Sequence, residues 1–357
     1  VDAHLGRRQH PFRHQGPRDR RRAADIGQLL EPLGTLSFED AYELYREMVV
    51  AAQDAGADLI VFETFTDLYD MKAAVLAAKE HTHLPILATM SFEGNRRTFT
   101  GTTVPAMAMT LEGLGVDAIG FNCSLGPAEI LSLAEELRQW TDLPLVVKPN
   151  AGLPDPQTNE YTITAAEFAR EMVPFTQLGV RILGGCCGTS PEFIQELRHA
   201  IGTEPPEMPR PPKRHGVCSA SQVAEFTGVR VVGERINPTG KKRFQQALRE
   251  HDLDYILNQA MAQQDAGADI LDVNVGLPGI DEVAMMIDVV KAIQSVVSLP
   301  LQIDSTNPEV IEAGLRACCG RAIVNSVNGK EEILDAILPI VKKYGAAVVG
   351  LAMDENG

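Results

Sequence analysis

One recurring pattern constrains the fold of this chain more than any other feature: an amphipathic helix, a glycine or Leu-Pro stop, and then a short apolar strand. Largely apolar strands that are separated by single helices are typical of parallel α/β sheets. In the first half the pattern predicts helices over 38–55, 68–81, 104–113, 127–140 and 164–178, and strands over 59–63, 86–91, 118–123, 145–150 and 180–186. In the second half it predicts strands over 230–235, 269–274, 301–304, 322–325 and 347–353.

A proline-rich stretch divides the pattern into two domains. Five prolines fall within residues 202–214, and such a segment cannot continue a helix or a central strand. We therefore expect a first domain over 35–201, a linker over 202–227 and a second domain over 228–357. The phrase Gln-Asp-Ala-Gly-Ala-Asp occurs in both domains, at 53–58 and 264–269, and a helix that ends at a glycine before a buried strand explains it.

The number of repeats in each half indicates the class of α/β fold. Each half shows about five strand–helix units, whereas a closed (β/α)8 barrel takes about 250 residues. Open sheets are one interpretation. We favour the other, in which two TIM-type (β/α)8 barrels stand in tandem, the first lacking its N-terminal strands and the second its C-terminal strands.

Composition narrows the class of protein. The net charge of −16 argues against a general binder of nucleic acid or of anionic membranes, and no apolar run approaches the ~18 residues of a membrane helix. Six cysteines, four of them in adjacent pairs, do not resemble a secreted disulfide framework, so a cytoplasmic location is expected. Residues 1–34 differ from the rest: seven arginines against four acids predict a basic, disordered or non-native stretch, the alternative being an RNA-binding arm.

Three cysteines stand at the carboxyl ends of predicted strands in the first half. In α/β barrels the catalytic groups lie at these ends, so Cys123, Cys186 and Cys187 are expected to meet at one rim with Glu63 and Asn150. Three thiolates can hold a catalytic zinc that keeps a fourth position open for a thiol substrate. The alternative is that a cysteine at a strand end is a small buried hydrophobe, which we favour for Cys218, Cys318 and Cys319.

Carboxylates and amides stand at the strand ends of the second half. Asp272, Asn274, Asp304 and Asn325 lie at the ends of three different predicted strands. Together they form a polar floor that can pair with a flat, nitrogen-rich heterocycle such as a pterin. The alternative for any one of them is that it caps the following helix.

The first half resembles the homocysteine S-methyltransferase family. The resemblance is carried by Gly-Phe-Asn-Cys-Ser at 120–124, Lys-Pro-Asn-Ala-Gly at 148–152 and Gly-Gly-Cys-Cys-Gly-Thr at 184–189. It implies that Cys123, Cys186 and Cys187 bind Zn²⁺, that the zinc binds the homocysteine sulfur, and that Glu63 holds the amino group of the substrate. Asn150 is a further substrate-binding candidate. The Asp-Gly motif that opens the family's barrel has no match in residues 1–34.

The second half resembles the pterin-binding family, through Gly-Glu-Arg-Ile-Asn at 233–237, Asp-Val-Asn at 272–274, Ile-Asp-Ser at 303–305 and Asn-Ser at 325–326. The first of these motifs favours the methyltetrahydrofolate methyltransferase branch. By this resemblance Asn274, Asp304 and Asn325, with Asp272, contact 5-methyltetrahydrofolate.

The order of the two modules is similar to that of the cobalamin-dependent methionine synthase family. The resemblance implies methyl transfer from 5-methyltetrahydrofolate to homocysteine by way of methylcobalamin, which a cobalamin-binding module outside this sequence would carry. Two alternatives stay open: a catalytically inactive fragment that binds zinc or folate, and a homocysteine methyltransferase joined to another folate enzyme such as a flavin-dependent reductase. Neither nucleic acid nor membrane is an expected partner.

Overall fold

The computed structural model of the chain describes residues 29–357 except 156, 159, 162, 203–209 and 355–357. Most of the segment expected to be basic and disordered, residues 1–28, lies outside the described residues. In the described end of this segment, Leu30 is buried and forms a β-bridge with Leu36. An apolar side chain packed in this way fixes the chain just before the first described helix.

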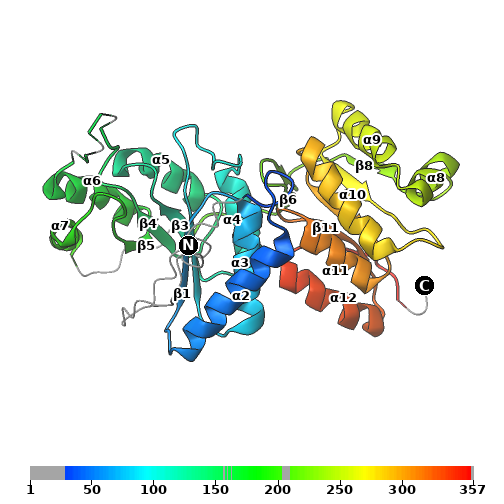
Figure 1. Cartoon of the computed structure of the whole chain (residues 1–357), viewed down its shortest axis with the longest axis horizontal. Helices are drawn as coiled ribbons and strands as arrows, with labels where there is room; N and C mark the ends of the chain where they lie inside the picture. Colours follow the sequence, from blue (N-terminus) through cyan, green and yellow to red (C-terminus); the bar gives the residue numbers. More distant parts are fainter. Residues whose placement is uncertain (1–28, 156, 159, 162, 203–209, 355–357) are drawn as a thin grey trace. The chain divides into compact units, whose positions relative to one another are not determined.

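The chain divides into two compact units between Lys213 and Arg214. In the first unit, helices and strands alternate as the sequence pattern predicts (Figure 1). Its helices are α2 (Phe38–Asp54), α3 (Leu68–His81), α4 (Val104–Leu114), α5 (Pro127–Arg138), α6 (Ala165–Gln177) and α7 (Pro191–Ile201). Its strands are β1 (Ile60–Phe65), β2 (Ile86–Met90), β3 (Ala118–Asn122), β4 (Leu145–Lys148) and β5 (Val180–Leu183).

The strands of the first unit lie in sequence order. All neighbours are parallel, in the order β1-β2-β3-β4-β5, and each helix from α2 to α7 packs against the next one along the chain. An unbroken order of this kind is the winding of a (β/α)8 barrel, whereas a doubly wound sheet reverses its order at a switch point. Among the described residues the sheet has five strands and is not closed. The expected α/β fold of barrel type is confirmed, and within the described residues the barrel is not closed.

The second unit repeats the same winding. Its main sheet has the order β12-β11-β10-β9-β8, again all parallel and in sequence order. The strands are β8 (Val232–Ile236), β9 (Ile270–Val273), β10 (Leu301–Asp304), β11 (Ile323–Val327) and β12 (Ala347–Gly350). The helices are α8 (Lys242–Glu250), α9 (Leu253–Asp265), α10 (Glu282–Val296), α11 (Pro308–Ala317) and α12 (Glu331–Tyr344).

A short hairpin lies where the sequence indicated only a linker. Strands β6 (Gly216–Cys218) and β7 (Val223–Glu225) pair antiparallel, and Cys218 forms a further bridge with Arg321. The strand pairing places Val217 and Ala224 in a small buried cluster with Ile270 and Ile323. The later part of the expected linker over 202–227 therefore contains a paired hairpin.

The repeated phrase has the same local structure in both units. Helices α2 and α9 are capped at their C-terminal ends by Ala55 and Ala266, and the glycine that follows each cap takes a positive φ, 79° at Gly56 and 89° at Gly267. The helix-terminating role that the sequence predicted for these glycines is confirmed. No described helix has the length and apolarity that crossing a membrane requires.

Candidate functional site

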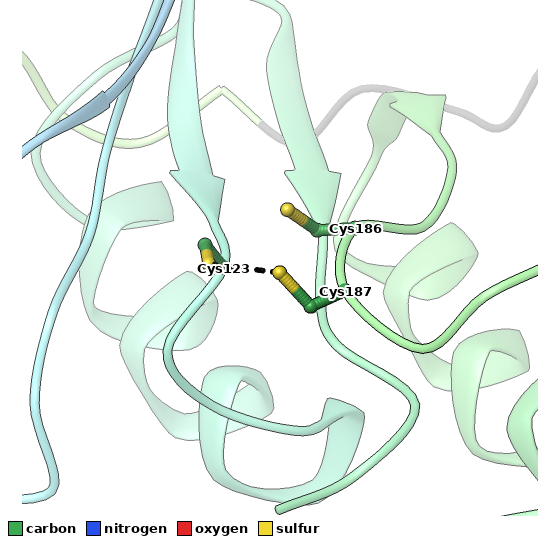
Figure 2. A group of neighbouring side chains, drawn as sticks. All are labelled: Cys123, Cys186 and Cys187. Carbon is green, nitrogen blue, oxygen red and sulfur yellow. Dashed lines mark hydrogen bonds between the residues drawn. The ribbon is translucent and has the colours of Figure 1, made fainter. Parts of the chain in front are cut away.

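Three cysteine side chains converge at one rim of the first sheet (Figure 2). Cys123 follows β3 directly, and Cys186 and Cys187 lie in the loop after β5, so the cluster spans the end of β4. The Sγ atoms of Cys123 and Cys187 are 3.7 Å apart, and all three Sγ atoms lie within 4.8 Å of one another. Of the described residues, these three form the one such group of His, Cys, Asp and Glu side chains.

Backbone bonds around β4 hold the three cysteines in place. The Cys123 N–H donates to the Lys148 carbonyl at 3.1 Å, and the Cys186 N–H donates to the Pro149 carbonyl at 2.8 Å. The N–H of Cys187 donates to Oδ1 of Asn150 at 3.1 Å. Cys123 itself has a φ of 63°, a left-handed conformation that is strained for a residue with a side chain and that turns the chain sharply after β3.

Two glycines beside the cysteine pair are required by close approach. A Cβ at Gly185 would lie 2.5 Å from Oγ1 of Thr189, and one at Gly188 would lie 2.4 Å from Cγ of Tyr161. Gly188 also has a φ of 78°. The glycines of the motif Gly-Gly-Cys-Cys-Gly-Thr therefore allow a tightly packed loop that carries two adjacent thiols.

The thiols share one negative charge. A hydrogen bond from the Cys186 thiol is the main cause that lowers the pKa of Cys123 to about 5, while burial opposes this shift. The same bond, followed by burial, raises the pKa of Cys186, and burial is the first cause that raises the pKa of Cys187. One thiolate on Cys123, stabilised by two neighbouring thiols, is the state these contacts favour at neutral pH.

The donor set fits a zinc ion. In tetrahedral zinc sites with Zn–S bonds of ~2.3 Å the sulfur atoms lie about 3.8 Å apart, and the Cys123–Cys187 separation of 3.7 Å matches this value. Cys123 and Cys186 are half-buried and Cys187 is exposed, so the cluster is open to solvent on one side. Three protein ligands with an accessible fourth position are typical of catalytic rather than structural zinc.

Asn122 organises this rim, and the sequence analysis did not single it out. Its side chain is 1% exposed, and its Oδ1 accepts hydrogen bonds from the Thr64 N–H at 2.8 Å and the Thr89 hydroxyl at 2.7 Å. Its Nδ2 donates to Thr64 Oγ1 at 2.7 Å and to the Cys186 sulfur at 3.9 Å. A polar amide at the end of a fully buried strand was the signal that could have identified it.

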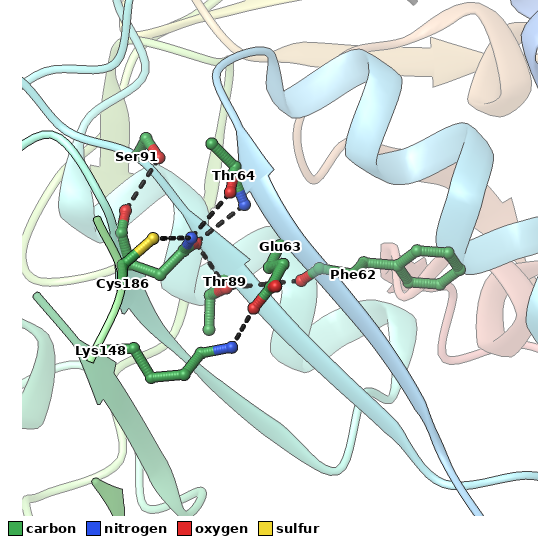
Figure 3. A network of polar contacts seen from close by, with 8 residues as sticks. Phe62, Glu63, Thr64, Thr89, Ser91, Lys148 and Cys186 are labelled. Atoms are coloured by element: carbon green, nitrogen blue, oxygen red, sulfur yellow. Dashed lines mark hydrogen bonds and ion pairs between the residues drawn. The ribbon is translucent and has the colours of Figure 1, made fainter. Parts of the chain in front are cut away.

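The structure places Glu63 and Asn150 at the same rim. Glu63, on β1, forms an ion pair with Lys148, the last residue of β4, within the polar network of Figure 3. Asn150 is 3% exposed, and its side chain bonds to the backbone of Cys187 and to the Cys123 thiol. Its side chain therefore supports the cysteines directly, a contact that the expected substrate role did not include.

The four predicted folate contacts also lie together, at the rim of the second sheet. Nδ2 of Asn274 donates to Oδ2 of Asp304 at 3.0 Å, and the Asn325 side chain hydrogen-bonds to Asp272. Burial raises the pKa of Asp272 to about 6, the negative charges of Asp304 and Glu234 add to the rise, and a hydrogen bond from Gln302 opposes it.

Gln302 is the second functional candidate that the sequence analysis missed. It lies inside β10 and is 9% exposed, and its Nε2 donates to Oδ1 of Asp272 at 2.5 Å. An amide between two apolar residues of a buried strand was again the available signal.

Comparison with known proteins assigns a family to each unit. The model of the homocysteine S-methyltransferase family matches residues 13–201, more than half of the chain, and that of pterin binding enzymes matches 233–357. The first match begins inside the arginine-rich segment that the sequence analysis set apart.

Two curated relatives are similar over most of the chain. The chain is 35% identical to methionine synthase of Mycobacterium tuberculosis over 347 residues and 34% identical to that of Mycobacterium leprae over 352 residues, each covering 93% of this chain. It spans 29% of the length of both relatives. Among solved structures, the oxidised homocysteine methyltransferase MmuM of Escherichia coli is 29% identical, with 46% of this chain and 53% of that chain covered at a TM-score of 0.39.

The cysteine motifs and the family match lie in the same unit, and the polar rim and the pterin-binding match in the other. The chain belongs to the homocysteine S-methyltransferase family, a family of methyltransferases, and carries a pterin-binding domain after it.

Proposed function

We propose that the first unit binds one zinc ion through Cys123, Cys186 and Cys187 and methylates the sulfur of homocysteine to form methionine. The observation that carries the proposal is the convergence of three Sγ atoms within 4.8 Å at a solvent-accessible rim. A zinc ion held there would act as a Lewis acid that favours the ionised form of a thiol substrate at neutral pH.

The residues around the cysteines have distinct tasks in this proposal. Asn122 and Asn150 orient the sulfur ligands through the hydrogen bonds described above. Glu63 contributes a half-buried carboxylate that can bind the ammonium group of homocysteine. The substrate is thereby held at both ends, which fixes its sulfur for attack on a methyl group.

The second unit is proposed to bind 5-methyltetrahydrofolate as the methyl donor. Asp272, Asn274, Asp304 and Asn325 offer donors and acceptors at one rim for the edge of a pterin ring. Because its pKa is about 6, Asp272 is partly protonated near neutral pH and can supply a proton as the methyl group leaves the folate nitrogen. Transfer by way of methylcobalamin on a separate module, and a cytoplasmic location, complete the proposal.

Zinc content is the first test. The full chain is purified under reducing conditions and its zinc is measured, with Cys186→Ser as the test variant and Cys319→Ser, a cysteine of the second unit, as the matched control. We expect one zinc per chain in the parent and the control and less than about a tenth of that in Cys186→Ser. Folded parent protein without zinc would contradict the proposal.

Methyl transfer is the second test. Zinc-loaded protein is given homocysteine and added methylcobalamin, and methionine is measured. Methionine formed by the parent and not by Cys186→Ser supports the proposed reaction. Stoichiometric zinc without methionine would instead indicate a zinc-binding protein that lacks this activity, and a titration with 5-methyltetrahydrofolate tests the second unit separately.

A further inference from the structure

The ion pair between Glu63 and Lys148 joins two strands that are not neighbours. Glu63 lies on β1 and Lys148 ends β4, with β2 and β3 between them, so both side chains reach across the same rim (Figure 3). The Glu63 and Lys148 side chains are 12% and 20% exposed. The aliphatic part of Lys148 runs along the segment before the cysteine pair, since a Cβ at Gly184 would lie 3.3 Å from its Cγ.

Both members of the pair are tied to the cysteine cluster. Thr64, the neighbour of Glu63, donates its N–H to the amide of Asn122, and that amide also donates to the Cys186 sulfur. The carbonyl of Lys148 accepts the N–H of Cys123. The ion pair and the three thiols are therefore parts of one connected rim, which offers a thiol substrate a carboxylate and an ammonium of the protein in addition to the sulfur ligands.

The charge balance of this pair limits what can bind beside it. If the ammonium of a substrate takes the place beside Glu63, Lys148 loses its anionic partner in a half-buried site, and an uncompensated charge there is costly. The α-carboxylate of an amino acid, attached to the same carbon as its ammonium, can replace that partner. A thiol with only one of the two charges leaves either Lys148 or Glu63 facing a charge of its own sign.

We propose that Lys148 binds the α-carboxylate of the thiol substrate, so that Glu63 and Lys148 together select an α-amino acid zwitterion. This inference rests on the proposed function and names the group that gives that site its substrate class. Lys148 is then a substrate-binding residue, with a role separate from the folding of the rim.

The test compares three thiols that differ only in charged groups: homocysteine, 3-mercaptopropylamine, which lacks the carboxylate, and 4-mercaptobutyrate, which lacks the amine. Their binding to the zinc-loaded full chain is measured by titration calorimetry for the parent, for Lys148→Met, which keeps an unbranched aliphatic chain beside Gly184, and for Lys148→Arg, which keeps the charge.

In the parent, loss of the carboxylate should weaken binding by about tenfold or more, the usual effect of a charge-assisted hydrogen bond. In Lys148→Met homocysteine should bind at least about tenfold more weakly, whereas 3-mercaptopropylamine should bind more tightly than to the parent, because the ammonium of Lys148 no longer repels it. Lys148→Arg should retain the preference for the carboxylate.

If Lys148→Met binds both homocysteine and 3-mercaptopropylamine more weakly than the parent does, and by the same factor, the inference is overturned. That result would mean that Lys148 only positions Glu63. Zinc content and the fluorescence of Trp140, the single tryptophan of the chain, show whether each variant is folded and loaded. A zinc-loaded parent that binds none of the three thiols overturns the proposed function together with the inference. Thiol binding with an unchanged carboxylate preference in Lys148→Met overturns the inference alone.

Discussion

The two units of this chain wind their strands alike and differ in the chemistry of their rims. In the part of the chain that the structure describes, each has a parallel sheet of five strands in sequence order, and each places polar side chains at the carboxyl ends of those strands. The first rim gathers three thiols around Cys123, whereas the second gathers carboxylates and amides around Asp272. One scaffold thus supports a site suited to a soft metal and a site suited to a heterocycle, and the difference lies in a few strand-end residues.

A buried amide supports each rim, and the two amides differ in the number of partners. Asn122 makes hydrogen bonds to Thr64, Thr89 and Cys186, so it connects three strands of the first sheet. Gln302 donates to Asp272, one strand away. The first rim should therefore depend more strongly on its amide than the second, and this comparison can be tested by mutation.

The largest effect is expected for Asn122→Ala. The substitution leaves the buried Thr64 N–H without its acceptor and the Thr89 hydroxyl with only the long contact to the Phe62 carbonyl at 3.5 Å, and it opens a cavity, so the free energy of unfolding of the first unit should fall by about 4 kcal/mol. Urea unfolding followed by Trp140 fluorescence measures this change. The affinity for zinc should also fall, by about tenfold or more, because Cys186 loses a hydrogen bond that orients it.

The matched control for this substitution is Asn95→Ala. Asn95 is an exposed asparagine of the same unit whose Oδ1 accepts one hydrogen bond, from the N–H of Arg97. Its removal should lower the free energy of unfolding by less than about 1 kcal/mol and leave zinc binding unchanged. A comparable loss in both variants would show that Asn122 has no special part in the rim.

The next effect is expected at the glycine after the cysteine pair. Gly188 and Gly56 have φ angles of 78° and 79°. A Cβ added at Gly188 would lie 2.4 Å from Cγ of Tyr161, whereas a Cβ added at Gly56 would have no atom within 4 Å. Gly56→Ala should therefore lower the free energy of unfolding by about 1 kcal/mol, because of the left-handed backbone alone. Gly188→Ala should lower it by about 3 kcal/mol, because the clash with Tyr161 is added. Trp140 fluorescence in urea reports both values, and equal losses would show that Tyr161 yields freely.

Strand order and helix bounds were predictable because apolar periodicity and helix stops are local. Helix 68–81 and strand 301–304 have the predicted bounds, and the other predicted elements lie within three residues of theirs. The strands predicted to end at 150 and 186 end two and three residues earlier, because strand pairing stops at Lys148 and Leu183 and the chain then enters the loops that carry Asn150 and Cys186.

The parts that could not be predicted depend on contacts between distant residues. The residues of the thiol cluster were expected at one rim, yet the sequence gives no indication that the Asn122 amide joins Thr64 to Cys186, or that Lys148 pairs with Glu63 across two strands. The hairpin at β6 and β7 was missed for the same reason, because it is stabilised by burial of Val217 against residues more than fifty positions away.

A smaller, pH-dependent effect is expected for the second rim. The pKa of Asp272 is raised to about 6 in the folded chain from an ordinary value of 3.8, so the folded state binds more protons than the unfolded state between these values. Its contribution to stability is therefore lost as the pH rises from about 4 to 6. As the pH rises from 4.5 to 7, the free energy of unfolding of Asp272→Asn should therefore increase relative to that of the parent by on the order of 2 kcal/mol.

Urea unfolding followed by far-UV circular dichroism at the two pH values measures that gain, with Asp252→Asn as the control. The backbone hydrogen bond from Tyr255, followed by the hydrogen bond from Arg243, lowers the pKa of Asp252 below 3.8. Its stabilising contribution is therefore lost only as the pH falls below about 4, and the difference between Asp252→Asn and the parent should be nearly the same at pH 4.5 and pH 7. A difference between the parent and Asp272→Asn that does not vary with pH would contradict a raised pKa at Asp272.

The smallest effect is expected for Gln302→Ala, and its pH dependence distinguishes a specific contact from simple loss of packing. Gln302 donates to the Asp272 carboxylate and is the main cause opposing the rise of its pKa, so the variant should lose about 1 kcal/mol at pH 7 and less at pH 4.5, where that carboxyl is largely protonated. In the Asp272→Asn background the pH dependence of this loss should disappear. A loss at pH 7 equal to that of Asn122→Ala would show that both rims depend on their amides to the same degree. The loss expected here is about fourfold smaller, because Gln302 donates one hydrogen bond to Asp272 whereas Asn122 takes part in four.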